Sequence, residues 1–240
     1  MKICVAQTKP VKGDIEANIK NHKKLIDLAV ANNAGMIIFP ELSVTGYEPE
    51  LAKALAADKN DKRFRDFQNI SDDQNISIGV GMPLKSDEGI LISMLIFQPD
   101  QPLEIYSKQY LHEDEYPYFV SGRNQKLSVE NNHKISFAIC YELSVPEHAE
   151  KAFENKAGFY IASVAKSASG IEKACERLSA IAKKYSMYVL MSNCAGHCDN
   201  FDCGGKSSVW NNKGSLLAQL DDENEALLIF DSITEEIIKK

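Results

Sequence analysis

Glu41, Lys108 and Cys140 each directly follow an apolar or β-prone run of the kind that fills a buried strand. A carboxylate or an ammonium group is costly at the end of a buried strand unless it is paired or functional. Together the three groups could carry out acyl chemistry. A carboxylate can take a thiol proton, a thiolate can attack a carbonyl carbon, and an ammonium group can hold the resulting oxyanion. Taken singly, they are more simply a solvated turn carboxylate, a surface lysine and a core cysteine.

The segment around Cys140 shows the same ambiguity. The apolar run 135–139 stops at the cysteine, and the helix-opening residues 144–147 follow shortly. A thiol between a buried strand and a helix occupies the usual ligand position of α/β folds, where backbone N–H groups and the helix dipole favour a thiolate. A free cysteine is also among the most buried residue types. The other two residues therefore decide the interpretation in favour of a nucleophile.

The elements that must position these residues alternate along the chain. The pattern predicts strands at residues 2–8, 36–39, 76–80, 91–97, 103–107, 135–139, 159–163 and 188–192, with short β segments near residues 209, 216 and 228. It predicts helices at 15–30, 51–56, 63–70, 146–155 and 171–185. Because no linker, repeat or low-complexity segment interrupts the alternation, we expect one α/β domain over residues 1–240. How the strands pair cannot be read from this pattern.

The bulk composition excludes several classes of partner. The chain has 240 residues, of which 44% are apolar and 25% charged, as in a soluble globular protein. With a net charge of -7 and no lysine–arginine block, we expect no nucleic acid and no membrane as a partner. No apolar run approaches the ~18–20 residues that span a bilayer, and the first residues read as a strand instead of a signal. A cytoplasmic location with the 6 cysteines reduced is therefore expected.

Several motifs surround the three residues in a fixed order. They are Phe39-Pro40-Glu41-Leu42, Thr45-Gly46-Tyr47, Lys108, Cys140-Tyr141-Glu142 with Pro146-Glu147, Asn193 with Gly196, and Gly205, Ser207 and Gly214. This order resembles the nitrilase (carbon–nitrogen hydrolase) superfamily along nearly the whole chain. The resemblance implies an α/β fold of the four-layer α-β-β-α sandwich type, which usually forms a homodimer or higher homo-oligomer. It also implies chemistry on the carbon–nitrogen bond of an amide or nitrile.

The resemblance also implies a role for each matching residue. Cys140 would be the nucleophile and Glu41 the general base, while Lys108 and the backbone N–H of Tyr141 would hold the oxyanion. A second glutamate of the site matches Glu115 by its spacing to the motif Tyr118-Phe119, and its neighbour Glu113 is the alternative. Tyr47 and Glu142 are assigned to substrate binding.

The same triad leads to three physical expectations. Lys108 should lower the pKa of the Cys140 thiol, and partial desolvation should raise the pKa of Glu41. Oxyanion donors are commonly worth ~3–4 kcal/mol each, so Lys108→Ala should lower turnover sharply. We also expect this variant to leave the fold intact.

A cysteine-rich segment offers four soft ligands, which are Cys194, His197, Cys198 and Cys203. Such a set raises the possibility of structural zinc. No Cys-x-x-Cys pair is present, however, and the segment corresponds to a variable loop in the family. We therefore expect no metal and no cofactor.

The expected function is hydrolysis of a small linear amide, of ω-amide or N-carbamoyl type, through a thioester with release of ammonia or an amine. One alternative is amide condensation or acyl transfer, because an amine can capture the same thioester. Another is a catalytically silent binding protein on the same fold, against which the complete set of Glu41, Lys108 and Cys140 argues. Nitrile hydrolysis is not the expected reaction, because stand-alone members of this length are more often amidases by family analogy.

Overall fold

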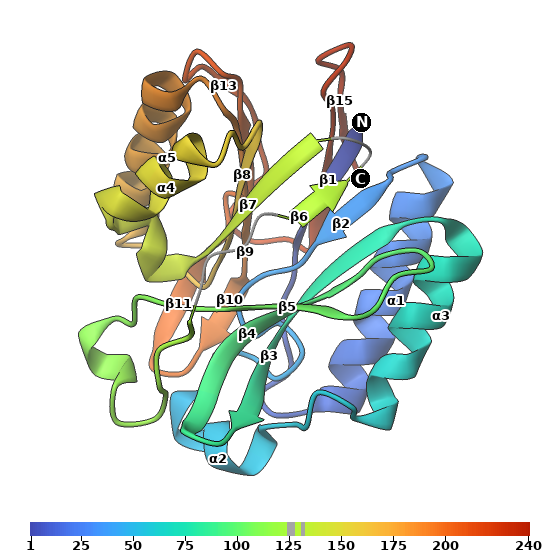
Figure 1. Cartoon of the computed structure of the whole chain (residues 1–240), viewed down its shortest axis with the longest axis vertical. Coiled ribbons are helices and arrows are strands. Elements are labelled where there is room, and N and C mark those ends of the chain that lie inside the picture. The colour runs from blue at the N-terminus through green and yellow to red at the C-terminus, as the bar shows by residue number, and fades with distance from the viewer. Residues whose placement is uncertain (124–127, 131–132) are drawn as a thin grey trace.

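Two large β-sheets face each other at the centre of the computed structural model, which describes residues 1–123, 128–130 and 133–240 (Figure 1). The first sheet has seven strands in the described residues. In spatial order they are β15 (Ile237–Lys239), β14 (Ala226–Asp231), β1 (Lys2–Gln7), β2 (Met36–Ile38), β3 (Ser77–Ser86), β4 (Gly89–Phe97) and β5 (Glu104–Ser107). Its central strands β1, β2 and β3 run parallel, and both edges are antiparallel.

The second sheet contains the strand that ends directly before Cys140. Its order is β13 (Leu216–Gln219), β12 (Ser208–Trp210), β9 (Tyr188–Asn193), β8 (Phe159–Val164), β7 (His133–Ile139) and β6 (Ser128–Glu130). Strands β7, β8 and β9 are parallel and almost wholly buried, which explains their continuous apolar sequences.

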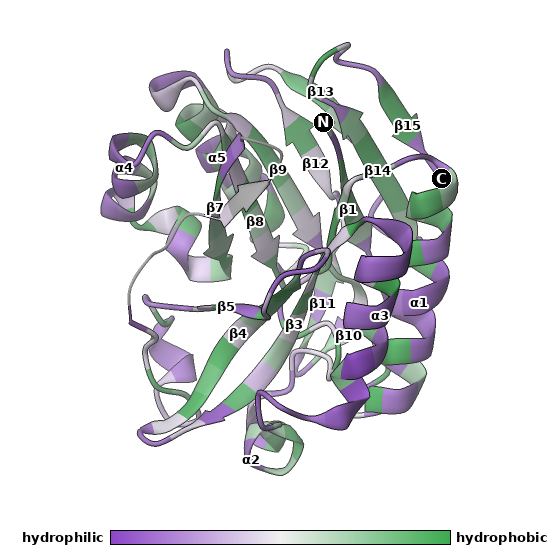
Figure 2. Cartoon of the chain, turned by 45° about the vertical axis from the view of Figure 1, so that its right-hand side comes forward, coloured by the Kyte–Doolittle hydropathy of each residue, from purple (hydrophilic) through white to green (hydrophobic). Residues whose placement is uncertain are grey.

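Helices cover the outer face of each sheet (Figure 1). On the first sheet lie α1 (Ile15–Ala31) and α3 (Arg65–Gln74), and on the second lie α4 (Pro146–Glu154) and α5 (Ile171–Tyr185). The helix α1 begins at Asp14, whose side chain accepts a hydrogen bond from the Ala17 N–H, and α4 begins with Pro146 at its first position. Figure 2 shows the polar sides of these helices turned away from the sheets.

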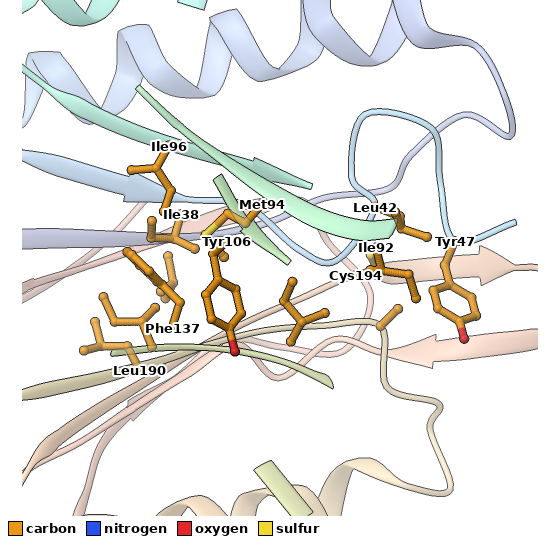
Figure 3. Close-up of a cluster of buried hydrophobic side chains, with 14 of the residues drawn as sticks. Ile38, Leu42, Tyr47, Ile92, Met94, Ile96, Tyr106, Phe137, Leu190 and Cys194 are labelled. Atoms are coloured by element: carbon orange, nitrogen blue, oxygen red, sulfur yellow. The ribbon is translucent and has the colours of Figure 1, made fainter. Parts of the chain in front are cut away.

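The innermost layer is an apolar core between the two sheets. Side chains from both sheets interdigitate there, including Ile38, Met94, Phe137 and Leu190 (Figure 3). Two further apolar clusters lie between each sheet and its helices. The predicted four-layer α-β-β-α sandwich is therefore confirmed.

Most predicted elements form within a few residues of their expected bounds. The predicted helix at 51–56 forms as η1 (Pro49–Leu51) followed by α2 (Ala52–Leu55), and η2 (Lys62–Phe64) leads into α3 at the predicted helix 63–70. The structure adds short 3₁₀ turns at η3 (Glu113–Glu115) and η4 (Cys140–Ser144). It also adds a hairpin that the pattern did not predict, formed by β10 (Ala195–Cys198) and β11 (Phe201–Gly204). None of the helices in these described ranges combines the length and the apolar character needed to cross a membrane.

Candidate active site

The two predicted glutamates meet at the predicted lysine. Lys108 Nζ lies 2.8 Å from Glu41 Oε1 and 2.6 Å from Glu115 Oε1, and it donates a hydrogen bond to each. All three side chains are at most 1% exposed. A buried ammonium group between two carboxylates is held in one position, because each charge compensates the burial of the others. Residues that are 67 positions apart in the sequence therefore form one charged cluster.

Glu41 is placed by the turn that follows β2 and by the end of β8. The Ala165 N–H donates to Glu41 Oε2 at 3.2 Å, and the Ser163 hydroxyl donates to the Phe39 carbonyl at 2.8 Å. The turn packs so closely on Gly81 that a Cβ there would lie 2.3 Å from the Leu42 nitrogen. Glycine at this position is therefore what allows the backbone carrying Glu41 to approach β3.

Glu115 is fixed at both carboxylate oxygens. Its Oε1 accepts hydrogen bonds from Lys108 and from the Tyr47 hydroxyl, the latter at 2.9 Å, while its Oε2 accepts the His112 N–H at 2.7 Å. The alternative Glu113 is exposed. The structure therefore brings Glu115, and not Glu113, into the cluster. Tyr47 lies at the same site and holds Glu115.

Cys140 follows β7 and begins the 3₁₀ turn η4. Its backbone has a φ of 45°, in the left-handed region that non-glycine residues rarely adopt. Such a conformation costs on the order of 1–3 kcal/mol and is found where the surrounding structure imposes it, often at functional sites. This sharp strand-to-helix turn aims the thiol at the cavity instead of into the core.

Burial raises the pKa of the Cys140 thiol to about 11, and the Glu41 carboxylate raises it too, whereas Lys166 and Lys108 lower it. Lys108 thus acts on the thiol in the expected direction, but desolvation outweighs it. The resting sulfur is therefore a thiol, and a base must take its proton during attack.

Glu41 has the properties of that base. Burial raises the pKa of Glu41 above the ordinary carboxyl value, Lys108 lowers it, and the like charge of Glu115 raises it further, with a net upward shift. The same carboxyl group lies close enough to Cys140 to raise the pKa of the thiol. For Lys108, burial lowers the pKa, but Glu41, Cys140 and Glu115 raise it above its ordinary value, so the ammonium group stays protonated.

A pH profile can test this electrostatic arrangement. If Glu41 is the base, activity should fall as the pH drops through the raised pKa of Glu41. Glu115→Gln removes the like charge that helps to raise the pKa of Glu41. The acid limb of the pH profile of kcat/KM should therefore move to lower pH. Glu113→Gln, an exposed neighbour, should leave the limb where it is. An unchanged limb in Glu115→Gln would show that the acid limb does not report Glu41.

Glu142 does not reach the cavity, contrary to its assignment to substrate binding. Its side chain is fully buried, and its carboxylate accepts hydrogen bonds from the Ile139 N–H at 2.7 Å, the Gln109 N–H at 2.6 Å and the Tyr106 hydroxyl at 2.6 Å. It therefore ties the residue before Cys140 to the residue after Lys108. Charge-assisted hydrogen bonds of this kind are worth about 1.5–3 kcal/mol each. Glu142 is a positioning residue for both.

The cavity beside the cysteine has a volume of about 490 Å³. Its lining comprises Tyr47, Pro49, Glu50, His112, Asp114, Glu115, Tyr118, Cys140, Tyr141, Ala165, Lys166, Ser167, Ser169, Gly170, Asp199, Asn200 and Phe201. Glu41 and Lys108 lie behind this lining and are 1% and 0% exposed. The cavity therefore presents a thiol to a small ligand, with the base and the ammonium group buried behind it.

The sequence patterns did not identify Lys166 as part of the site. It is the one lysine or arginine in the described lining, and it lies two residues after the end of β8. The signal was available, because Lys166 closely follows a buried strand, as Glu41, Lys108 and Cys140 do. The wall formed by Asp199, Asn200 and Phe201 belongs to the β10–β11 hairpin, which was not predicted.

An α-β-β-α sandwich with two buried glutamates, a lysine and a cysteine at one cavity defines a class of thiol-containing carbon–nitrogen hydrolases. The model of the carbon-nitrogen hydrolase family matches residues 2–237. The chain belongs to this family, as the sequence motifs predicted.

Individual relatives are more distant. The chain is 27% identical over 237 residues to the glutamine-dependent NAD(+) synthetase of Aquifex aeolicus, covering 95% of this chain and 41% of that protein. It therefore spans less than half the length of this relative. It is 22% identical over 231 residues to the omega-amidase YafV of Yersinia enterocolitica, covering 95% of this chain and 88% of the relative.

A solved structure shares the fold. The amidase from Nesterenkonia sp. AN1, determined as a mutant in complex with butyramide, superposes with a TM-score of 0.89 at 21% identity, covering 98% of this chain and 92% of that one.

Proposed function

We propose that this protein hydrolyses the terminal amide of a small carboxylate-bearing molecule, an ω-amide, through a thioester on Cys140. The observation that carries the proposal is the buried, hydrogen-bonded set of Glu41, Lys108 and Glu115 beside Cys140, which lines the cavity. Comparison supports the substrate class, because one relative is named an omega-amidase and another is named glutamine-dependent.

The geometry supports a defined order of events. Glu41 takes the thiol proton while the sulfur of Cys140 attacks the amide carbon, so the carbon–sulfur bond forms as the carbonyl oxygen becomes an oxyanion. In this scheme Lys108 Nζ and the Tyr141 N–H stabilise that oxyanion. Glu41 then passes its proton to the departing ammonia, and the carbon–nitrogen bond breaks to leave a thioester.

The second half of the reaction uses the same base. Glu41 takes a proton from water, the resulting hydroxide attacks the thioester, and the thiol leaves with that proton restored to it. The product is the carboxylic acid. Glu115 does not exchange protons in this scheme. Its role is to keep Lys108 in place, because both of its oxygens are occupied by protein donors.

The charges around the cavity favour a substrate that carries its own charges. Lys166 can pair with a substrate carboxylate, since its position after β8 places it beside Cys140. Glu50, Asp114 and Asp199 line the same cavity and can receive a substrate ammonium group. An amino-acid ω-amide such as glutamine has both groups, and a simple aliphatic amide has neither.

This substrate assignment leads to a prediction for Lys166→Met. Losing a charge-assisted contact of about 1.5–3 kcal/mol should lower kcat/KM for glutamine and glutaramate by roughly 10- to 100-fold. Butyramide, which lacks the carboxylate, should lose much less. Ammonia release across these three amides measures the effect. The ratio between substrates is the informative quantity, because Lys166 also lowers the pKa of the thiol and its loss will slow all of them.

Ser169→Ala, at another lining position, is the matched control and should keep the wild-type ratio. If Lys166→Met lowers kcat/KM for butyramide as much as for glutaramate, the lysine does not recognise a carboxylate. If the wild-type protein releases no ammonia from any ω-amide or from an N-carbamoyl compound, the proposed function is wrong.

A further inference from the structure

Three cysteine sulfurs meet at a place that the proposed reaction does not use. The Sγ atoms of Cys194, Cys198 and Cys203 all lie within 4.8 Å of one another. The three residues are 0%, 1% and 5% exposed, and all are free thiols. A core built only for packing has no need to converge three thiols on one point.

The backbone brings the sulfurs together by a specific route. Cys194 follows β9, Cys198 ends β10 and Cys203 lies in β11. Two residues four positions apart in an extended strand would be far apart, but Gly196 between Cys194 and Cys198 has a φ of 79° and breaks the extension. Cys203 of β11 lies directly opposite Gly196 in the hairpin, at a register position between Cys194 and Cys198.

We infer that Cys194, Cys198 and Cys203 form a binding site for a single thiophilic cation of the Zn²⁺ or Cu⁺ type. Thiolates are the ligands that select these ions. With zinc–sulfur bonds of about 2.3 Å, sulfurs around one ion are about 3.8 Å apart, so the three need only a small contraction. The sequence alone predicted no metal, because no Cys-x-x-Cys pair is present; the strand pairing supplies the convergence that the spacing lacks.

His197 is not part of this site, although it belongs to the same segment. It alternates with Cys198 along β10, so it lies on the opposite face, where its Nδ1 is 2.9 Å from Asp202 Oδ1 and its side chain is 67% exposed. Among the described residues the ligand set is therefore three sulfurs. Cu⁺ accepts such a set as it stands, and Zn²⁺ would add one ligand from solvent.

An ion at this position would act on one wall of the cavity. The turn between β10 and β11 provides Asp199 and Asn200 to the lining, and Phe201 at the start of β11 follows them. Cys198 also accepts the backbone N–H of Tyr47, whose hydroxyl holds Glu115. The ion would thus fix the hairpin and the loop that carries Tyr47. Its role is structural, and it takes no part in the proposed hydrolysis.

The test is an anaerobic titration of reduced protein with Zn²⁺ and, separately, with Cu⁺, in a Cys140→Ala background that removes the cavity thiol. We expect one equivalent of either ion to bind and to raise the Tm, because a ligand that binds only the folded state stabilises it. Adding Cys198→Ala should abolish both effects. Adding Cys175→Ala, at a half-buried thiol of α5, should leave both unchanged.

A second measurement covers the case in which the Cys198 variant fails to fold. In the Cys140→Ala protein, the ion should slow alkylation of Cys194, Cys198 and Cys203 under mild denaturation, as read by peptide mass spectrometry, and leave Cys175 unprotected. Absence of stoichiometric binding of both ions, or equal protection of Cys175, would overturn the inference. Because activity is not a readout, failure here is distinguishable from failure of the proposed hydrolysis.

Discussion

Lys108→Met is expected to lower kcat for amide hydrolysis by about 10²–10³-fold, the usual effect of removing one oxyanion donor. It should also destabilise the fold by about 3–5 kcal/mol, because Glu41 and Glu115 would be left as unpaired buried charges. This predicted destabilisation differs from the expectation drawn from the sequence, which was that loss of Lys108 leaves the fold intact. Steady-state ammonia release and denaturant unfolding measure the two effects.

A double variant separates the two roles of the lysine. Lys108→Met with Glu115→Gln removes one charge of each sign, so it should regain part of the lost stability while its turnover stays low. Lys85→Met, at an exposed position of β3, is the control and should change neither quantity. If Lys108→Met retains wild-type kcat in a folded protein, the lysine does not hold the oxyanion.

Glu41→Gln should lower kcat/KM at neutral pH by about 10²–10⁴-fold, because the amide side chain cannot accept the thiol proton. With a thiol pKa of about 11, only about one molecule in 10⁴ carries a thiolate at pH 7. The variant should therefore recover about tenfold in rate per pH unit as alkali generates the thiolate directly. The rate should stop rising at a pH below the pKa that the Cys140 thiol has in the wild-type protein, because the Glu41 charge that raises this pKa is gone.

Glu50→Gln tests whether any cavity carboxylate would give the same result. Glu50 is exposed at the cavity lining, away from the buried cluster, so its amide variant should keep the wild-type pH profile of kcat. A Glu41→Gln protein with the wild-type rate and pH profile would show that another group takes the thiol proton.

The sequence was sufficient to identify the buried cluster, for a physical reason. Glu41, Lys108 and Cys140 each end an apolar run, and a charge or a nucleophile at such a place is costly without a partner. Spacing to a motif of the family was enough to prefer Glu115 over Glu113. The strands were equally readable, because buried parallel strands such as β8 have continuous apolar sequences, but their arrangement in four layers was implied only by the family resemblance.

The sequence did not predict the features that depend on the direction of the backbone. Glu142 was assigned to substrate binding, but the turn after a left-handed Cys140 carries its side chain back to the Ile139 N–H. The β10–β11 hairpin lacks a run of β-branched residues, so no strand pattern marked it. Its absence from the prediction also hid the convergence of the three sulfurs. Assembly into a homodimer stays a prediction from family resemblance.

Alkylation by iodoacetamide tests the central claim, that Cys140 is the nucleophile, most directly. One equivalent should be incorporated at Cys140, as located by peptide mass spectrometry, at the same rate as activity is lost, and an ω-amide substrate should slow both. Cys140→Ser should have no comparable turnover. Activity that disappears while Cys140 remains unlabelled, or that survives complete labelling of Cys140, would contradict the account.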